Sequence, residues 1–192
     1  MITREQRRAM ILNAALKVFS QKGINEATIE NIAKEAEVGK GTVYEYFESK
    51  KSLFQEMIKF SVTQYHENLK KSLLVEGSLR VKLINLLKYH MKFLSENIDI
   101  IHTAAEPNNL SKDMRHWMMN ERKVIFSQLK KILDEAKQNG EMKKSVNTEL
   151  AVFCLIGTAN QYGGNRVIVN KTGTNDAELE AVVSILLGGI GS

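Results

Sequence analysis

The chain has 192 residues, a formal net charge of +5 and 43% hydrophobic residues, which supplies ample apolar side chains for packed cores and excludes a disordered chain. One proline, 7% aromatic residues and abundant Leu, Ile, Lys, Glu and Ala favour an all-helical protein. The single cysteine, Cys154, excludes a disulfide within the chain and fits a reducing cytosol, so we expect a cytoplasmic protein. No apolar run reaches the roughly 18 residues of a membrane span, so we expect no membrane partner.

The first expected helix covers residues 4–21. Thr3 and Gln6 lie three residues apart and read as a capping box rather than as the opening of a signal peptide. Gly23 is expected to end this helix, because glycine is favoured just past a helix end. One side of the helix is apolar: Ile11, Ala14, Ala15, Val18 and Phe19.

Two short helices joined by a tight turn are expected between Thr28 and Lys51. Thr28 is a good N-cap, because its hydroxyl can accept a hydrogen bond from an otherwise unpaired backbone N–H. The helix that follows carries apolar residues at helical spacing on one side, and Gly39 breaks the pattern. These apolar residues are Ile29, Ile32, Ala33 and Ala36.

The second of these helices has Val43 and Phe47, four residues apart, on its inner side. Its other side suits contact with a phosphate-lined groove, because Gly41 allows close approach and Lys40 supplies charge. The remaining outward residues are Thr42, Tyr44 and Glu45. Ser49 is expected to cap a third helix with Lys50 and Lys51 in its first turn. Helices and a turn of this size predict a helix-turn-helix.

The charge of this region is a weaker signal than the pattern. Residues 1–53 contain nine Lys or Arg and seven Asp or Glu, so they hold only +2 of the net +5. A basic surface is compatible with nucleic acid without requiring it. The alternative is a generic three-helix bundle that makes no DNA contacts.

The segments GKGTVYEYF (39–47) and SKKSLF (49–54) resemble the recognition-helix signature of TetR-type transcriptional regulators, and AALKVF (14–19) with Lys22-Gly23 matches that family's first helix and its stop. The close resemblance covers residues 1–55. It implies an all-α protein with a three-helix DNA-binding domain at 1–50 and a helical ligand-sensing and dimerisation domain at 51–192.

The resemblance also implies the function: a homodimer that binds a double-stranded DNA operator and is a repressor released by a small-molecule effector. The residues that match the family's DNA contacts are Thr28, Lys40, Gly41, Thr42, Tyr44, Tyr46 and Lys50. Two positions depart from the pattern. Gly39 occupies a place where the family often has a capping Ser or Thr, and Glu45 puts an acid near the groove, where it accepts from cytosine or faces solvent.

The rest of the chain is expected to be helical. A long helix begins near Leu53, and further helices are expected at 78–94, 98–105, 111–138, 147–168 and 175–188, with a break at Gly77 and loops at Pro107-Asn108 and Lys171-Thr172-Gly173. The last two helices are expected to pair with their copies across a two-fold axis. The residues expected at that interface are Gly157, Asn160 and Gly164 on the glycine-marked face of the first of these helices, and Leu179, Val183 and Leu186 on the apolar stripe of the second, which continues to Ile190. Part of that stripe must also pack inside its own subunit, and the sequence does not divide the two roles.

The family's pockets lie between its middle helices, which implies a largely apolar ligand site here. The residues expected to line it are Met91, Leu94, Ile98, Ile101, Met114, Trp117, Met118, Phe126 and Phe153. Each of these residues could instead fill the core, and the sequence does not separate the two roles. Charged candidates are fewer (His102, Glu106 and Arg115), so we expect a mostly hydrophobic effector that is neutral or weakly anionic.

No catalytic or metal-binding pattern appears. The four histidines (His66, His90, His102 and His116) lack metal-site spacing, and neither a G-x-S-x-G motif nor a complete phosphate loop is present. We therefore expect no enzyme activity, metal or cofactor. The rival interpretation is a helical ligand-binding or scaffolding protein whose helix-turn-helix is purely structural. The identity of the effector and the choice between repression and activation stay open.

Overall fold

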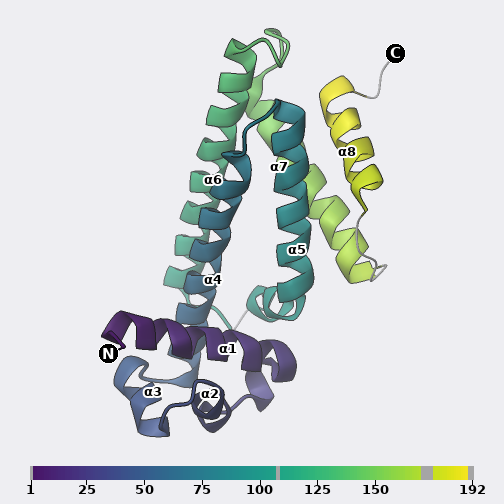
Figure 1. Cartoon of the computed structure of the whole chain (residues 1–192). Coiled ribbons are helices and arrows are strands. Elements are labelled where there is room, and N and C mark those ends of the chain that lie inside the picture. Colours follow the sequence, from purple (N-terminus) through teal and green to yellow (C-terminus); the bar gives the residue numbers. More distant parts are fainter. Residues whose placement is uncertain (1, 107–108, 170–174, 190–192) are drawn as a thin grey trace. The chain divides into compact units, whose positions relative to one another are not determined.

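The computed structural model describes residues 2–106, 109–169 and 175–189, and within them every regular element is helical (Figure 1). This confirms the all-α prediction. The elements are α1 (Arg4–Glu26), α2 (Ile29–Glu35), α3 (Lys40–Tyr46), α4 (Lys50–Leu73), α5 (Leu79–Ala105), α6 (Lys112–Gln138), α7 (Thr148–Gly164), the π-helical turn η1 (Asn165–Val169) and α8 (Asp176–Gly188). The expected loop residues Pro107, Asn108 and Lys171-Thr172-Gly173, and Ile190, lie outside the described residues.

The helix starts follow the expected caps. Thr3 and Gln6 form a reciprocal capping box at α1, and Asn147 accepts hydrogen bonds from two backbone N–H groups of α7. Asn175 caps α8 in the same way. Gly23 has φ +72°, so the regular part of α1 stops there before one further turn reaches Glu26.

One expected break is absent. The sequence predicts separate helices at 78–94 and 98–105, but α5 runs without interruption from Leu79 to Ala105. The intervening Ser95, Glu96 and Asn97 include no glycine or proline, and Asn97 and Ile100 are buried, so the helix continues its packed face. The prediction of two helices is wrong here.

The chain forms two compact units. The first contains residues 1–64 and 97–115. Its α1 contacts α2, and α2 contacts α3. The rings of Phe19 and Phe54, both fully buried, meet edge to face at 5.3 Å between centroids. Ser111 donates a hydrogen bond to Gln55 at 2.8 Å, which ties the second segment of this unit to α4.

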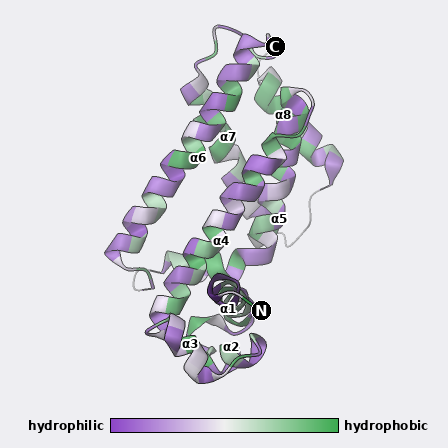
Figure 2. Ribbon diagram, turned by 60° about the vertical axis from the view of Figure 1, so that its left-hand side comes forward, coloured by the Kyte–Doolittle hydropathy of each residue, from purple (hydrophilic) through white to green (hydrophobic). Residues whose placement is uncertain are grey.

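The second unit contains residues 65–96 and 116–192. Its core is a contiguous apolar cluster from the second half of α4, the first half of α5, the second half of α6, and α7 and α8. Along α6, hydrophilic and hydrophobic residues alternate in bands, as expected of a helix with one packed face (Figure 2). At its edges, Lys88 pairs with Asp176 at 2.8 Å, and His66 pairs with Glu121 at 2.9 Å. None of the described helices is both long and apolar enough to cross a membrane.

Candidate DNA-binding surface and ligand cavity

The helix-turn-helix forms as its caps predict. The Thr28 hydroxyl accepts a hydrogen bond from the Asn31 N–H at 3.2 Å, which starts α2. Glu37 adopts the left-handed conformation, with φ +54°, in the turn that leads to α3. Gly39 precedes α3 and provides no capping side chain, so the expected departure from a capped start is present in the structure.

The two sides of α3 differ as expected. Val43 and Phe47 are buried, whereas Gly41 and Tyr44 are exposed, with 48% of Tyr44 accessible. A Cβ atom added at Gly41 would meet no other atom within 4 Å, so this part of the helix surface is open. The outward face of α3 therefore has the small and hydroxyl-bearing surface that a groove-binding helix needs.

Two other predicted DNA-contact residues, Lys40 and Tyr46, have partners within the three-helix DNA-binding domain. Thr42 and Tyr46 are half-buried, and the Arg4 guanidinium lies over the Tyr46 ring at 5.7 Å. Lys40 is exposed and forms an ion pair with Glu30 of α2. The hydrogen bond with Lys40 lowers the pKa of Glu30, and the same bond raises the pKa of Lys40. A DNA phosphate at Lys40 would thus replace a carboxylate partner that sequence reasoning missed.

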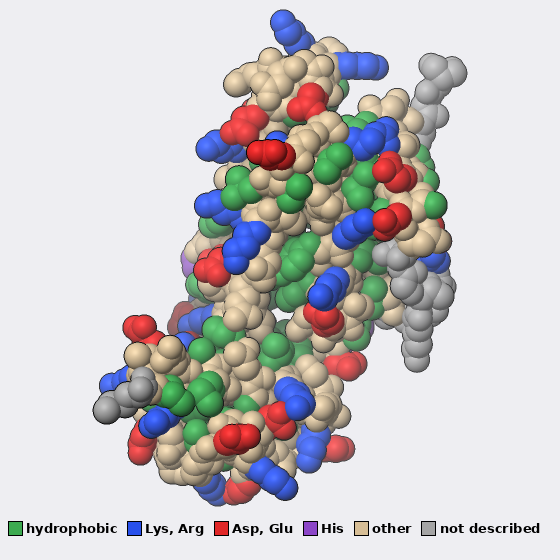
Figure 3. Space-filling model, viewed as in Figure 1, with side chains coloured by type: hydrophobic (Ala, Val, Ile, Leu, Met, Phe, Trp, Pro, Cys, Tyr) green, Lys and Arg blue, Asp and Glu red, His purple; other side chains and the backbone are tan. Residues whose placement is uncertain are grey.

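Basic and acidic side chains are interspersed over the face of the molecule in Figure 3 rather than gathered by sign. This agrees with the small excess of +2 in the first 53 residues. The shape and residue types of α3, more than bulk charge, therefore mark the DNA-binding surface.

Lys50 has a structural role beside its predicted contact with DNA. Its Nζ donates to the carbonyl oxygens of Asn25 at 3.2 Å and Ala27 at 3.0 Å, which joins the start of α4 to the segment before α2. Ser49 caps α4 as expected, because its Oγ accepts from the Ser52 N–H at 3.0 Å. A phosphate bound by Lys50 would lie beside the N-terminus of α2.

We expect Lys50→Ala to weaken operator binding across DNA sequences and to make its salt dependence shallower by about one phosphate contact. The lost hydrogen bonds should also lower the free energy of unfolding by about 1–2 kcal/mol. Operator titrations at several salt concentrations and urea unfolding measure the two effects separately. An unchanged salt slope together with lower stability would assign Lys50 a structural role only.

The second unit contains a cavity of about 470 Å³ between α4, α5, α6 and α7. Its walls are mostly aliphatic and aromatic, with a few polar groups, which is the usual composition of a small-molecule site. The lining residues are Tyr65, Leu69, Leu86, His90, Arg122, Ile125, Phe126, Leu129, Phe153, Leu155, Ile156, Ala159 and Asn160.

Two of the nine residues expected to line a ligand site, Phe126 and Phe153, line this cavity, and their rings lie 4.9 Å apart. Met91 and Met114 are buried elsewhere, Met114 in the first unit. The other five are half-buried outside the lining: Leu94, Ile98, Ile101, Trp117 and Met118. The charged candidates Glu106, His102 and Arg115 do not line it either. The structure thus brings together only part of the expected set.

Sequence reasoning missed the polar members of this site. His90, interpreted from sequence as structural or surface, is 9% exposed, and its Nδ1 lies 2.8 Å from the Tyr65 hydroxyl oxygen. Burial lowers the pKa of His90 to about 4, which outweighs the side-chain hydrogen bond with Asn160 that raises it, so the ring is neutral at pH 7. Burial also raises the pKa of Tyr65. The sequence does not reveal that these residues meet, because Tyr65 lies on α4, His90 on α5 and Asn160 on α7.

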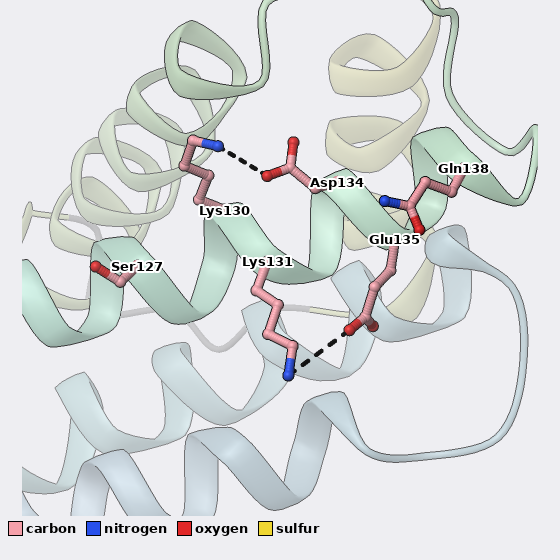
Figure 4. A pocket seen from close by; sticks show the side chains of 6 residues that line it. All are labelled: Ser127, Lys130, Lys131, Asp134, Glu135 and Gln138. Atoms are coloured by element: carbon pink, nitrogen blue, oxygen red, sulfur yellow. Dashed lines mark hydrogen bonds and ion pairs between the residues drawn. The ribbon is translucent and has the colours of Figure 1, made fainter.

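A second depression, of about 430 Å³, lies along α6 and has a different character. Lys130 pairs with Asp134 at 2.8 Å and Lys131 with Glu135 at 4.0 Å, each one helical turn apart (Figure 4). Exposed pairs of this kind contribute little to stability, because water and salt screen them. Because each of these lysines has a carboxylate partner on the same helix, this surface is a solvated helix face.

The residues expected at a dimer interface fall into different environments. Leu179 and Val183 are 1% and 0% exposed and belong to the chain's own core, so they are not open to a partner. Leu186 is half-buried against that core, and Asn160 lines the cavity. Gly164 is half-buried and Gly157 is exposed.

The exposed apolar residues of these helices are others: Leu150 and Phe153 on α7, and Ile185 and Leu187 on α8. Gly163 is the glycine that lets α7 approach α5. A Cβ added there would lie 2.7 Å from a Leu94 methyl group. On α7 and α8, the faces that are free for a partner therefore differ from those that the sequence stripe suggested.

Two family models match the chain. One, described as bacterial regulatory proteins of the tetR family, matches residues 11–57. The other, described as the C-terminal region of YsiA-like proteins, matches residues 54–189. Together they cover the helix-turn-helix and the helical remainder.

Among similar proteins, the fatty acid metabolism regulator protein of Bacillus subtilis is 26% identical over 182 residues, which span 94% of this chain and 93% of the relative. The crystal structure of the transcriptional regulator FadR from Bacillus subtilis in complex with stearoyl-CoA is 25% identical, with a TM-score of 0.75 over 95% of this chain and 99% of that one. The structure of FadR from Bacillus halodurans shares the fold at 23% identity, with a TM-score of 0.76 and 98% of each chain covered.

Proposed function

The chain belongs to the TetR family of bacterial DNA-binding transcriptional regulators, and from this premise we propose that it is a repressor released from its operator by a fatty acyl thioester such as an acyl-CoA. The observation that carries the proposal is the mostly apolar cavity of about 470 Å³ in the second unit. Its volume lies within the range of about 300–1,000 Å³ that is common for small-molecule sites.

The DNA-binding half of the proposal rests on α2 and α3. The open surface at Gly41 allows close approach to a groove, and the exposed Tyr44 provides a hydroxyl for phosphate or base edges. Lys40 at the start of α3 and Lys50 at the start of α4 supply positive charge, and Thr28 caps α2. Thr42 and Tyr46, both half-buried, complete the proposed set of DNA contacts.

A homodimer is proposed because a single DNA-binding domain of about 50 residues contacts few bases, whereas the two domains of a dimer can bind two half-sites. The exposed Leu150 and Phe153 on α7 and Ile185 and Leu187 on α8 are apolar residues that a partner copy would cover. Gly157 favours close approach of a partner helix there, because a Cβ added to it would meet nothing within 4 Å.

The effector class follows from the cavity and from the relatives. The Bacillus subtilis FadR structure contains stearoyl-CoA, a long apolar chain joined to a charged carrier. Here the aliphatic and aromatic walls suit the chain, and Arg122 among the lining residues supplies a cation for an anionic group. An acyl-CoA is more strongly anionic than the neutral or weakly anionic effector expected from sequence. We propose that the apolar acyl chain is the part that the cavity encloses.

Binding to the DNA upstream of the chain's own gene tests the regulator. Purified protein should shift a specific fragment with a dissociation constant that rises steeply with salt. Sedimentation should find two chains per half-site pair. Salt-dependent binding that makes no distinction between the upstream fragment and scrambled DNA would instead favour the rival, in which the helix-turn-helix is structural.

A further inference from the structure

The two flanks of α3 differ in their supply of positive charge. At 100° per residue, Lys40 lies to one side of the buried residue Val43, and Thr42 and Tyr46 lie to its other side. Lys40 pairs with Glu30, so the first flank faces α2. The Tyr46 flank has no cation from α3 itself, because Lys40 is the only basic residue of this helix.

A helix in the major groove has phosphates on both of its sides. The groove is about 12 Å wide and a helix with its side chains is about 10–12 Å across, so the helix comes close to both backbones. Lys40 can neutralise phosphates on the α2 side. Lys50 lies on that side too, because its Nζ donates to the carbonyl oxygen of Ala27 next to the cap of α2. A cation for the other backbone has to come from an element beside the Tyr46 flank.

The first turn of α1 lies beside that flank (Figure 1). The Arg4 guanidinium lies over the Tyr46 ring, 5.7 Å from its centroid. Arg4 is exposed, and among the described residues its guanidinium has no carboxylate or hydrogen-bond partner. The contact with the ring face holds the side chain in place and leaves its N–H donors open.

The neighbouring arginines of α1 differ from Arg4. Arg8 is half-buried, pairs with Glu56 at 2.7 Å and lies over the Phe47 ring at 5.5 Å, so it binds inside its own domain. Arg7 is exposed, but within the described part of the chain no ring or carboxylate directs its guanidinium toward α3. Arg4 alone of the three combines open donors with a contact that places it next to α3.

We propose that Arg4 binds a phosphate of the DNA backbone that runs along the Tyr46 flank of α3, opposite the backbone bound by Lys40 and Lys50. The first turn of α1 then belongs to the DNA-binding surface, which extends beyond the helix-turn-helix. Tyr46 positions the Arg4 guanidinium for this contact. The inference rests on the proposed placement of α3 in a DNA groove and adds a second line of phosphate contacts to it.

The salt dependence of operator binding measures the contact. Arg4→Ala should lower the slope of log affinity against log salt by about 0.9 per chain, the value for one phosphate, and should weaken binding to specific and scrambled DNA alike. Arg4→Gln, which keeps more of the aliphatic stem, should lower the slope equally, and Arg4→Lys should retain most of it because it keeps the charge. Lys70→Ala removes an exposed charge from the second unit and is the control that should keep the wild-type slope.

A scan with neutral methylphosphonate linkages identifies the backbone that Arg4 binds. Each phosphate of the operator duplex is replaced in turn, and the wild-type protein should lose affinity wherever it contacts the replaced group. Arg4→Ala should become insensitive to replacement at one linkage of each half-site. Lys50→Ala should become insensitive at a different linkage, on the other side of the groove.

Urea unfolding checks the fold of each variant, and Arg4→Ala should unfold at the wild-type urea concentration because Arg4 is exposed. A wild-type slope in Arg4→Ala and Arg4→Gln, or a lower slope with every linkage still sensitive, would overturn the assignment and leave the proposed function intact. Insensitivity at the linkage that Lys50→Ala also loses would overturn it too, by placing both cations on one backbone. If the wild type binds operator and scrambled DNA alike, the proposed function fails and the assignment falls with it.

Discussion

Replacing Gly41 by glutamate should abolish specific operator binding, by more than about 100-fold, while leaving the fold intact. Gly41 is exposed in the first turn of α3, and a side chain there has open space in the free protein. On DNA the added carboxylate would enter the groove against phosphates, and unfavourable like-charge contacts at an interface cost several kcal/mol. Anisotropy titration of a labelled operator measures the loss.

The stability of the same variant should move in the opposite direction. Glycine inside a helix costs about 0.5–1 kcal/mol relative to alanine, and an acid in the first turn interacts favourably with the helix dipole. Gly41→Glu is thus expected to unfold at the same or higher urea concentration than wild type. Asn13→Glu, at an exposed position of α1, is the matched control for the change in net charge and should bind the operator nearly as wild type does. Near-normal binding by Gly41→Glu would remove α3 from the interface.

Ala159→Phe should produce a repressor that no longer responds to its effector. Ala159 lies on α7, is 6% exposed and lines the cavity, so a benzyl group there takes up space that the ligand needs. Overfilling of a packed site typically costs 1–3 kcal/mol, and the upper part of that range corresponds to about 30- to 150-fold weaker effector binding. Operator affinity without effector should stay within a few-fold of wild type, because the DNA-binding domain is unchanged.

The control for this variant is Val124→Phe, which adds bulk next to the lining residues Ile125 and Phe126 but at a position that is 45% exposed. It should respond to stearoyl-CoA as wild type does. Titrating stearoyl-CoA into each protein's operator complex gives the effector concentration for half release. An Ala159→Phe variant that releases DNA at the wild-type concentration would show that the effector binds elsewhere.

The DNA-binding domain could be predicted from sequence because its helix caps and helical periodicity depend on residues close together in the chain. The caps at Thr3, Thr28 and Ser49 depend on hydrogen bonds within three residues, and the structure contains each of them. The outward face of α3 follows from the helical period, since burial of Val43 and Phe47 leaves Gly41 and Tyr44 outside. The partner of Lys40 was missed, because Glu30 lies ten residues away on a different helix.

The cavity could not be derived in the same way. Its lining depends on which faces of four helices meet, and the apolar residues of α5 and α6 look alike whether they fill a core or border a space. Trp117 and Met91 fitted the expected pattern yet lie outside the lining, whereas Leu86 and Ala159 belong to it. On α8 the sequence stripe contains Leu179 and Val183, which complete the chain's own core.

The coupling between DNA and effector is the central claim, and one thermodynamic comparison tests it most directly. The affinity of stearoyl-CoA should be measured for the free protein and for the protein saturated with operator. Because coupling between two sites is reciprocal, the ratio of these affinities must equal the factor by which stearoyl-CoA weakens operator binding. We predict that the free protein binds stearoyl-CoA more tightly by about 5- to 150-fold, the usual range for such coupling. Equal affinities for the free and DNA-bound protein would contradict the account.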